Sequence, residues 1–184
     1  MKHTSSLKRN ICKNILLAWM VINLFSCSQY QISKSPGIKE SRTWIVMPLE
    51  NNSNQPLASE KVEAILGASL FSLGVDVHMY PKSRATDLVS ILDNQTRKIK
   101  ADEWLVTQEA TYVITGSVNE WQYKNGLDGE PAVGITLELI DKISKISLWK
   151  SNGSRSGWGR ESLTGAGQIV IEELLDGLNI PDEQ

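Results

Sequence analysis

The feature that most restricts the fold of this 184-residue chain is a series of three long segments with strand character in its second half. Residues 111–123 are rich in β-branched and aromatic side chains, which are typical of strands. Residues 146–156 follow a turn at residues 144–145. Residues 132–141 alternate, and one face carries the apolar side chains Val133, Ile135, Leu137 and Leu139. The chain must therefore fold around a β-sheet.

Shorter segments on either side predict the rest of the fold. Residues 44–49 form a continuous apolar run that suits a strand buried on both faces, and Pro48 restricts this strand to an early or edge pairing position. Residues 75–80 alternate and predict another strand. Helical spacing or capping predicts helices at residues 57–73, 83–92, 101–108 and 162–178. The order β-α-β-α-α-β-β-β-α predicts an α/β fold, a mixed β-sheet covered by helices.

The amino terminus has the pattern of a cleaved signal. Residues 1–13 carry four cations and no acid, and a largely apolar run of eleven residues follows at 15–25. At about 1.5 Å per residue this run reaches roughly 16 Å, about half of a ~30 Å hydrocarbon core, which disfavours a transmembrane helix. Residues 24–27, Leu-Phe-Ser-Cys, resemble the lipobox of bacterial lipoproteins. We expect removal of residues 1–26 and lipidation of Cys27; the alternative is an ordinary secretory signal with a coincidental cysteine.

The residues around the lipidated cysteine predict where the domain is held. Several acyl chains on Cys27 give stable membrane anchoring. Ser28 stands where Asp, by resemblance to enteric lipoproteins, favours the inner membrane, so we expect the periplasmic face of the outer membrane. Cys12 lies in the signal, so the mature chain has a single cysteine and no intramolecular disulfide. The other expected parts are a flexible tether up to residue 42, a single α/β domain at 43–180 and a tail at 181–184.

Charge and composition argue against several functions. The whole chain has a net charge of −2, and the loss of four cations with the signal leaves −6 on the mature chain. Such a chain lacks the positive surface that dominates binding to phosphate backbones, so no nucleic-acid partner is expected. The mature chain has one histidine, His78, and no unmodified thiol, which leaves too few groups for a metal site or a polar catalytic triad. We expect His78 to be a half-exposed structural residue, with no metal and no cofactor.

The segment Gly-Leu-Asp-Gly at residues 126–129 lies between two predicted strands. It lacks the Gly-Lys-Ser/Thr ending of a phosphate-binding loop, so we interpret it as a β-hairpin loop. Asp128 and Glu130 allow two hypotheses, solvated turn acids or paired carboxylates for glycoside hydrolysis. Their spacing in a loop does not define the ~5–9 Å separation that such hydrolysis requires across a substrate.

Two segments are distinctive, GSVNEWQYKNGLDGEPAVG at residues 116–134 and LWKSNGSRSGWGRES at residues 148–162. Both closely resemble the PelC family, the outer-membrane lipoproteins of Pel exopolysaccharide export. Residues 44–52, the closing helix and the signal fit the same family, so the resemblance covers approximately residues 43–180. The first strand and the Leu-Trp dipeptide are shared more widely, with CsgG-like and TolB N-terminal-like α/β domains.

The resemblance implies a non-enzymatic domain whose subunits close into a homo-oligomeric, dodecamer-like ring beside a PelB-like outer-membrane β-barrel exporter. It also implies that the ring presents an acidic surface to Pel, an exopolysaccharide made partly cationic by deacetylation. The charge of −6 suits this role, because a ring multiplies it. Candidate guiding acids are Asp128, Glu130, Glu120 and Asp141, and the alternative for the last two is a solvated sheet face. Two other functions stay open: a periplasmic glycan-processing enzyme that uses Asp128 and Glu130, and a generic adaptor lipoprotein of an envelope machine.

Four aromatic residues have different expected roles. Trp158 lies between two glycines and is flanked by Arg155 and Arg160, which favours contact with membrane headgroups or, alternatively, with a neighbouring subunit. Trp149 follows a leucine in a strand and is expected in the core. Trp121 and Tyr123 share one strand face and are candidates for stacking on sugar or on a neighbouring subunit.

Overall fold

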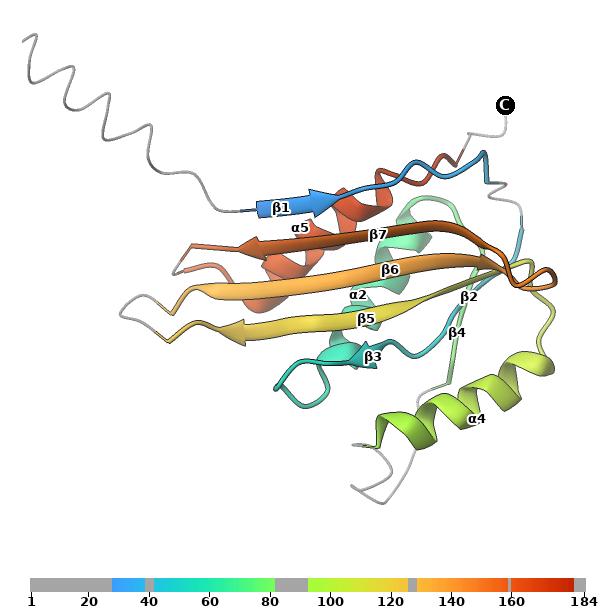
Figure 1. Cartoon of the computed structure of the whole chain (residues 1–184), viewed down its shortest axis with the longest axis horizontal. Helices are drawn as coiled ribbons and strands as arrows, with labels where there is room; N and C mark the ends of the chain where they lie inside the picture. The colour runs from blue at the N-terminus through green and yellow to red at the C-terminus, as the bar shows by residue number, and fades with distance from the viewer. Residues whose placement is uncertain (1–27, 39–41, 82–92, 126–128, 159, 181–184) are drawn as a thin grey trace, which may run out of the picture.

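The computed structural model describes residues 28–38, 42–81, 93–125, 129–158 and 160–180. Within them the chain forms a seven-stranded mixed sheet in the order β1-β7-β6-β5-β2-β4, with β3 also paired to β5 (Figure 1). Strands β1, β5, β6 and β7 pair antiparallel along the sheet, whereas β2 is parallel to both β4 and β5, and β3 is parallel to β5. The strands are Ser28–Gln31 (β1), Trp44–Val46 (β2), Glu50–Asn51 (β3), Val77–Met79 (β4), Tyr112–Tyr123 (β5), Pro131–Asp141 (β6) and Ser147–Ser156 (β7).

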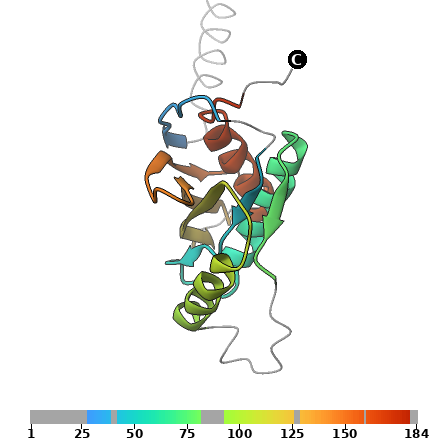
Figure 2. The same ribbon diagram turned by 90° about the vertical axis from the view of Figure 1, so that its right-hand side faces the viewer.

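Helices cover both faces of this sheet, but unequally. The helices α2 (Ala58–Ser72) and α5 (Leu163–Leu175) pack on one face over a large apolar core. The helix α4 (Asn94–Val106) lies apart from them, over the β2–β5 part of the other face (Figures 1 and 2). Residues of β2 alternate between the two cores, so the expected strand buried on both faces is confirmed. None of the helices in the described part of the chain is long and apolar enough to cross a membrane.

Local signals explain where the helices begin and end. Asp93 caps α4 by accepting hydrogen bonds from the N–H groups of Gln95 and Thr96, and Ser162 caps α5 by accepting one from Gly165. Gly74 follows α2 with a φ of 78°, the left-handed conformation that ends many helices and that glycine adopts without strain. The predicted helix at residues 83–92 lies outside the described residues.

The helix α4 begins earlier than the sequence analysis predicted, at residue 94 rather than 101. Apart from Ile99, its first two turns are polar, so they carry no apolar stripe that would indicate a helix. Two of its apolar side chains, Ile99 and Val106, are exposed to solvent. Capping by Asp93, rather than apolar periodicity, therefore accounts for the start of this helix.

The pairing position predicted from Pro48 is wrong. The strand β2 is not at an edge; it lies between β4 and β5 in the sheet. Pro48 stands just after β2, where the Met47 N–H still donates to the Ile114 carbonyl at 3.0 Å. Proline has no N–H to donate to a neighbouring strand. Pro48 therefore lies in the link between β2 and the short strand β3, outside both strands.

The prediction of a flexible tether after Cys27 is also wrong for residues 28–38. Ser28–Gln31 form β1, which pairs with β7 along its whole length. Farther on, the Ser35 N–H donates to the Gly177 carbonyl at 3.1 Å, and Ile38 is 1% exposed. Polar side chains suit an edge strand, because its outer face meets water while its backbone is satisfied by the neighbouring strand. These residues therefore belong to the folded domain.

Candidate functional site

The strand polarity gives the sheet two distinct ends. At one end lie the start of β1, the end of β7, the β5–β6 hairpin loop and the turn that contains Trp158; we call it the Trp158 end (Figure 1). At the other lie the start of β5 and the β6–β7 turn with Asp141, which we call the Asp141 end. Because β1 is antiparallel to β7, Ser28 is paired with Arg155 at the Trp158 end. Cys27, which precedes Ser28 in the chain, lies outside the described residues.

A network of backbone and carboxylate contacts fixes the turn that presents Trp158. The Gly157 N–H donates to the Pro131 carbonyl at 2.8 Å, and the Glu161 N–H donates to the Trp158 carbonyl at 2.8 Å. The Trp158 N–H donates to a carboxylate oxygen of Glu161 at 3.3 Å. A Cβ at Gly157 would come within 2.1 Å of that carboxylate and 2.8 Å of the Pro131 ring, so a larger residue here would displace the Glu161 side chain. Trp158 is 47% exposed, as expected for a residue outside the core.

The two arginines near this tryptophan differ in their surroundings. Arg155 donates to both carboxylate oxygens of Glu161, at 3.3 Å and 3.2 Å, and its side chain is 16% exposed. It also donates to the Ser28 hydroxyl at 3.4 Å, and so links the start of β1 to the Trp158 turn. Arg160 is exposed. Glu161 is a site residue that the sequence analysis missed, because nothing in its spacing marks it as the partner of Arg155.

Two of the four candidate acids lie at the Trp158 end. Glu130 is exposed, and its carbonyl accepts from the Lys124 N–H at 2.7 Å, which closes the β5–β6 hairpin as the sequence predicted. Glu120 is half-buried and accepts from the Gln122 side-chain amide at 3.2 Å. Asp128 lies outside the described residues. Glu120 and Glu130 are therefore carried by the same hairpin.

The fourth candidate acid, Asp141, lies at the other end of the sheet. It is separated from Glu130 by the length of β6, roughly 35 Å at about 3.3 Å per residue. Its carboxylate accepts from the N–H groups of Ser144 and Ile143 and from the Ser144 hydroxyl, and so organises the β6–β7 turn. The hydrogen bonds to Ser144, then that to Ile143, lower the pKa of Asp141. The fold of one chain thus does not place Asp141 beside Glu120 and Glu130.

The structure divides the strand aromatics between core and surface. Trp149 is buried, as predicted, and its indole N–H donates to the Ser33 carbonyl at 2.8 Å. The stacking role considered for Trp121 is wrong, because this side chain is 1% exposed. A β-bulge between Val118 and Glu120 shifts the register by one residue and turns Trp121 toward the core. Tyr123 is half-exposed, and its hydroxyl accepts from the Leu163 N–H at 3.3 Å.

Metal ligands are not gathered in the described part of the chain. No group of three or more His, Cys, Asp or Glu side chains that could hold a metal ion occurs there. The His78 side chain is 55% exposed and lies 3.7 Å from the Asp76 carboxylate, which is in line with the expected half-exposed structural residue.

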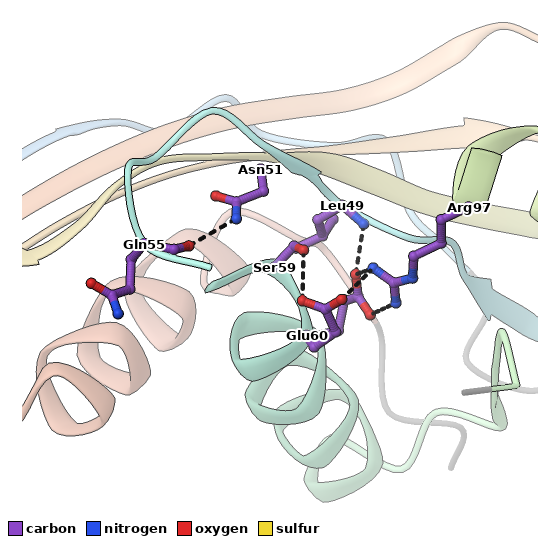
Figure 3. Close-up of polar contacts among 7 residues, drawn as sticks. Leu49, Asn51, Gln55, Ser59, Glu60 and Arg97 are labelled. Atoms are coloured by element: carbon purple, nitrogen blue, oxygen red, sulfur yellow. Dashed lines mark hydrogen bonds and ion pairs between the residues drawn. The ribbon is translucent and has the colours of Figure 1, made fainter. Parts of the chain in front are cut away.

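The most deeply buried charges join α2 to α4 (Figure 3). The Glu63 carboxylate accepts two hydrogen bonds from Arg97, at 2.9 Å and 2.5 Å, and one from the Leu49 N–H at 2.8 Å. Glu60 adds a second carboxylate 3.6 Å from the same guanidinium. Burial raises the pKa of Glu63, although Arg97 and the Leu49 N–H both oppose this shift. The sequence analysis missed this cluster, since Arg97 is more than thirty positions from both Glu60 and Glu63 and only the fold brings them together.

Solved structures similar to this chain share its arrangement over almost all of its length. A PelC dodecamer from Paraburkholderia phytofirmans is 30% identical, has a TM-score of 0.69, and is matched over 86% of this chain and 100% of that one. This chain belongs to the PelC family. A single-substitution variant of that dodecamer is 31% identical with the same TM-score, over 85% of this chain and 100% of the other. The resemblance noted in the sequence is thereby confirmed.

A more distant similarity supports the fold class alone. Lipoprotein GNA1162 from Neisseria meningitidis is 15% identical with a TM-score of 0.52, over 77% of this chain and 96% of that one. The predicted α/β fold, a mixed sheet covered by helices, is confirmed in this PelC-family chain. No family model and no curated protein matches it.

Proposed function

We propose that this chain is a lipid-anchored, non-enzymatic subunit of a ring that guides the cationic exopolysaccharide Pel to a PelB-like export pore in the outer membrane. The observation that carries this proposal is membership of the PelC family over 86% of the chain. The related protein from Paraburkholderia phytofirmans is a dodecamer, which supports a homo-oligomeric ring here. The alternatives, a glycan-processing enzyme and a generic envelope adaptor, are separated from it by the experiments below.

The position of the anchor supports an orientation in which the Trp158 end faces the membrane. Cys27 directly precedes Ser28, whose hydroxyl contacts Arg155 beside the Trp158 turn. With no free tether between them, acyl chains on Cys27 would hold this end close to the lipid. An exposed indole and the exposed Arg160 suit the headgroup zone, where tryptophan and arginine are favoured. The half-buried Arg155 would then act mainly by positioning the turn.

The charge of the mature chain supports the guiding role. A ring would repeat the −6 of each subunit around one opening, which focuses the field on a cationic polymer. At about 4 Å and surface-like dielectric each contact is worth at most a few kcal/mol before desolvation and salt screening. Many such weak contacts suit a polymer that slides past. Glu120 and Glu130 would act at the Trp158 end, beside the membrane, and Asp141 at the periplasmic end.

A charge-removal experiment tests the guiding role. In the mature protein in detergent, the double variant E120Q/E130Q should bind partly deacetylated, cationic chitosan several-fold more weakly at low salt. The difference should shrink at high salt, because screening weakens all charge contacts. The matched control E103Q/E109Q removes two exposed acids, one from the last turns of α4 and one from the segment that joins α4 to β5, near the Asp141 end. Equal binding by both variants and the wild type would contradict local guidance, and a generic adaptor predicts that result.

The same acids separate guidance from catalysis. Substitution of Asp128 or Glu130 alone should reduce Pel export only partly if charge is collective. An enzyme would instead lose a defined turnover completely with either substitution, together with the shortened or modified glycan that it produces. Analysis of the secreted polysaccharide from cells that carry D128N or E130Q measures both outcomes.

A partitioning experiment tests the membrane role of Trp158. In the full chain with C27S, which carries no acyl chains, W158A should bind vesicles at least about ten-fold more weakly, since a buried aromatic side chain contributes roughly 1.5–3 kcal/mol. The control F71A removes an aromatic residue that is 78% exposed near the Asp141 end, and it should have no effect. Unchanged partitioning of W158A with loss of the oligomer would instead assign Trp158 to a contact between subunits.

A further inference from the structure

The part of the sheet that α4 leaves uncovered is hollowed into one continuous trough. Three cavities of about 580, 490 and 570 Å³ adjoin one another on this face. The 580 Å³ and 490 Å³ cavities are both lined by Gln31, Thr136 and Asn152, and the 490 Å³ and 570 Å³ cavities are both lined by Thr136 and Lys150. The trough crosses β1, β7, β6 and β5 and ends beside β3 and the first turn of α4. Three strand spacings already give it a length of roughly 14 Å, and α4 closes its far end.

Amides and hydroxyls dominate the lining of the first of these cavities in the open-face trough. They are Gln29, Gln31, Asn119, Gln122, Thr136, Asn152 and Ser154, and the candidate acid Glu120 also lines this cavity. Neighbours on adjacent strands hold several of them in place: the Asn152 side chain donates to the side-chain amide oxygen of Gln31 at 3.3 Å, and the Asn119 side chain donates to the Thr136 hydroxyl at 3.0 Å. The charges toward the middle compensate each other, since Lys150 lies 3.0 Å from Glu138. The central surface is therefore polar, preorganised and nearly neutral.

This chemistry selects among possible occupants. An apolar segment would bury these amides without hydrogen-bond partners, which costs free energy for each group. A second copy of the chain is disfavoured because the trough lacks the apolar, aromatic centre on which stable subunit interfaces depend. Amides and hydroxyls do match the hydroxyl and acetamido groups of a sugar, since each side offers both donors and acceptors. A linear depression also suits a linear polymer.

We propose that the open-face trough binds uncharged, acetylated sugar residues of the exopolysaccharide. This inference rests on the proposed function for the nature of the polymer, and it assigns a second type of contact to it. A partly deacetylated chain has both amine-bearing and acetamido-bearing residues. The acids attract the former at long range, and the trough holds the latter through short hydrogen bonds. Binding in the trough is therefore insensitive to salt, unlike binding by the acids.

The test uses the mature protein in detergent with two probes, a fully acetylated chitin hexamer and its deacetylated, cationic counterpart. The double variant Q31V/N152V replaces two residues that face each other across β1 and β7 with strand-forming side chains. Its affinity for the acetylated hexamer should fall about five- to ten-fold, as expected for the loss of one or two hydrogen bonds. The control Q168L removes an exposed amide from α5, on the opposite face, and should not change affinity. N152S is a milder substitution should the double variant fold poorly.

The outcomes separate this inference from the proposed function. The proposal that the trough binds acetylated sugars is overturned if the wild-type protein does not bind the acetylated hexamer. It is also overturned if Q31V/N152V binds this hexamer as tightly as the wild type does. A change of oligomeric state in Q31V/N152V but not in Q168L also overturns it, because the face is then a contact between subunits. Salt-insensitive binding of the acetylated hexamer without binding of the cationic one supports the trough and contradicts guidance by charge.

Discussion

The two faces of the sheet are held by different kinds of interaction. Under α2 and α5, apolar side chains from every long strand merge into one core of more than twenty buried residues. Under α4 the buried cluster has four members, Ile45, Met47, Ala101 and Val113, and the helix is also held by Arg97. The first face depends on buried apolar area, whereas the second depends on a few polar atoms whose partners must be in place. Mutations on the two faces should therefore fail in different ways.

The largest effect is expected on the face under α2 and α5. W121A removes a side chain that is 1% exposed and packs against α5, where a Cβ on Gly167 would come within 2.6 Å of the indole. We expect a loss of about 3–5 kcal/mol in the free energy of unfolding, measured by urea denaturation, because the cavity cannot close fully. The control Y123A, two residues along on the same strand, removes a half-exposed ring and should cost much less. Similar losses for the two variants would contradict a continuous core at Trp121.

The same contrast between apolar and polar regions explains which parts of this fold could be predicted from the sequence. The strands between residues 111 and 156 were predicted to within about one residue, because a sheet with one buried face imposes alternation on the sequence. The strand β1 and the first turns of α4 were missed. Polar side chains dominate both, and backbone pairing and a capping carboxylate hold them rather than an apolar pattern.

Residues of the candidate site could be predicted only where their surroundings are set by residues next to them in the sequence. The glycines around Trp158 correctly predicted an exposed indole. Trp121 was misjudged because a β-bulge, which strict alternation does not predict, decides which way it faces. The pairs Arg155–Glu161 and Arg97–Glu63 depend on how a turn and two helices come together, and single-sequence patterns carry no such information.

A smaller effect is expected from R97M on the other face. Loss of the Arg97 guanidinium leaves the Glu63 carboxylate, which is 6% exposed, with the Leu49 N–H as its remaining hydrogen-bond donor. Removing one member of a buried ion pair costs about 3 kcal/mol. Urea denaturation of R97M measures this loss, and hydrogen exchange should show the first turns of α4 opening before α2.

Two further variants show whether the cost in R97M comes from an unpaired charge. R97M/E63Q removes both charges and should recover a large part of the stability lost in R97M. K98M removes the neighbouring exposed cation and should have little effect. If R97M and R97M/E63Q are equally unstable, Arg97 holds α4 by packing rather than by charge, and the contrast between the two faces is weaker than described.

The smallest effect on stability is expected from removing the residues that cap α4 and α5. For α4, this effect should depend on pH. Hydrogen bonds from the Thr96 hydroxyl, then from the N–H groups of Thr96 and Gln95, lower the pKa of Asp93. The stabilisation by this carboxylate is present above the unfolded-state pKa of about 4 and is lost as pH falls through the lower folded-state pKa. The stability difference between wild type and D93A should therefore be clear at about pH 7 and diminish at about pH 3. The matched control S162A removes the hydroxyl that caps α5, and this hydroxyl does not titrate. The stability difference between wild type and S162A should therefore be the same at both pH values. A D93A difference that does not change with pH would mean that the ionised carboxylate does not hold the start of α4.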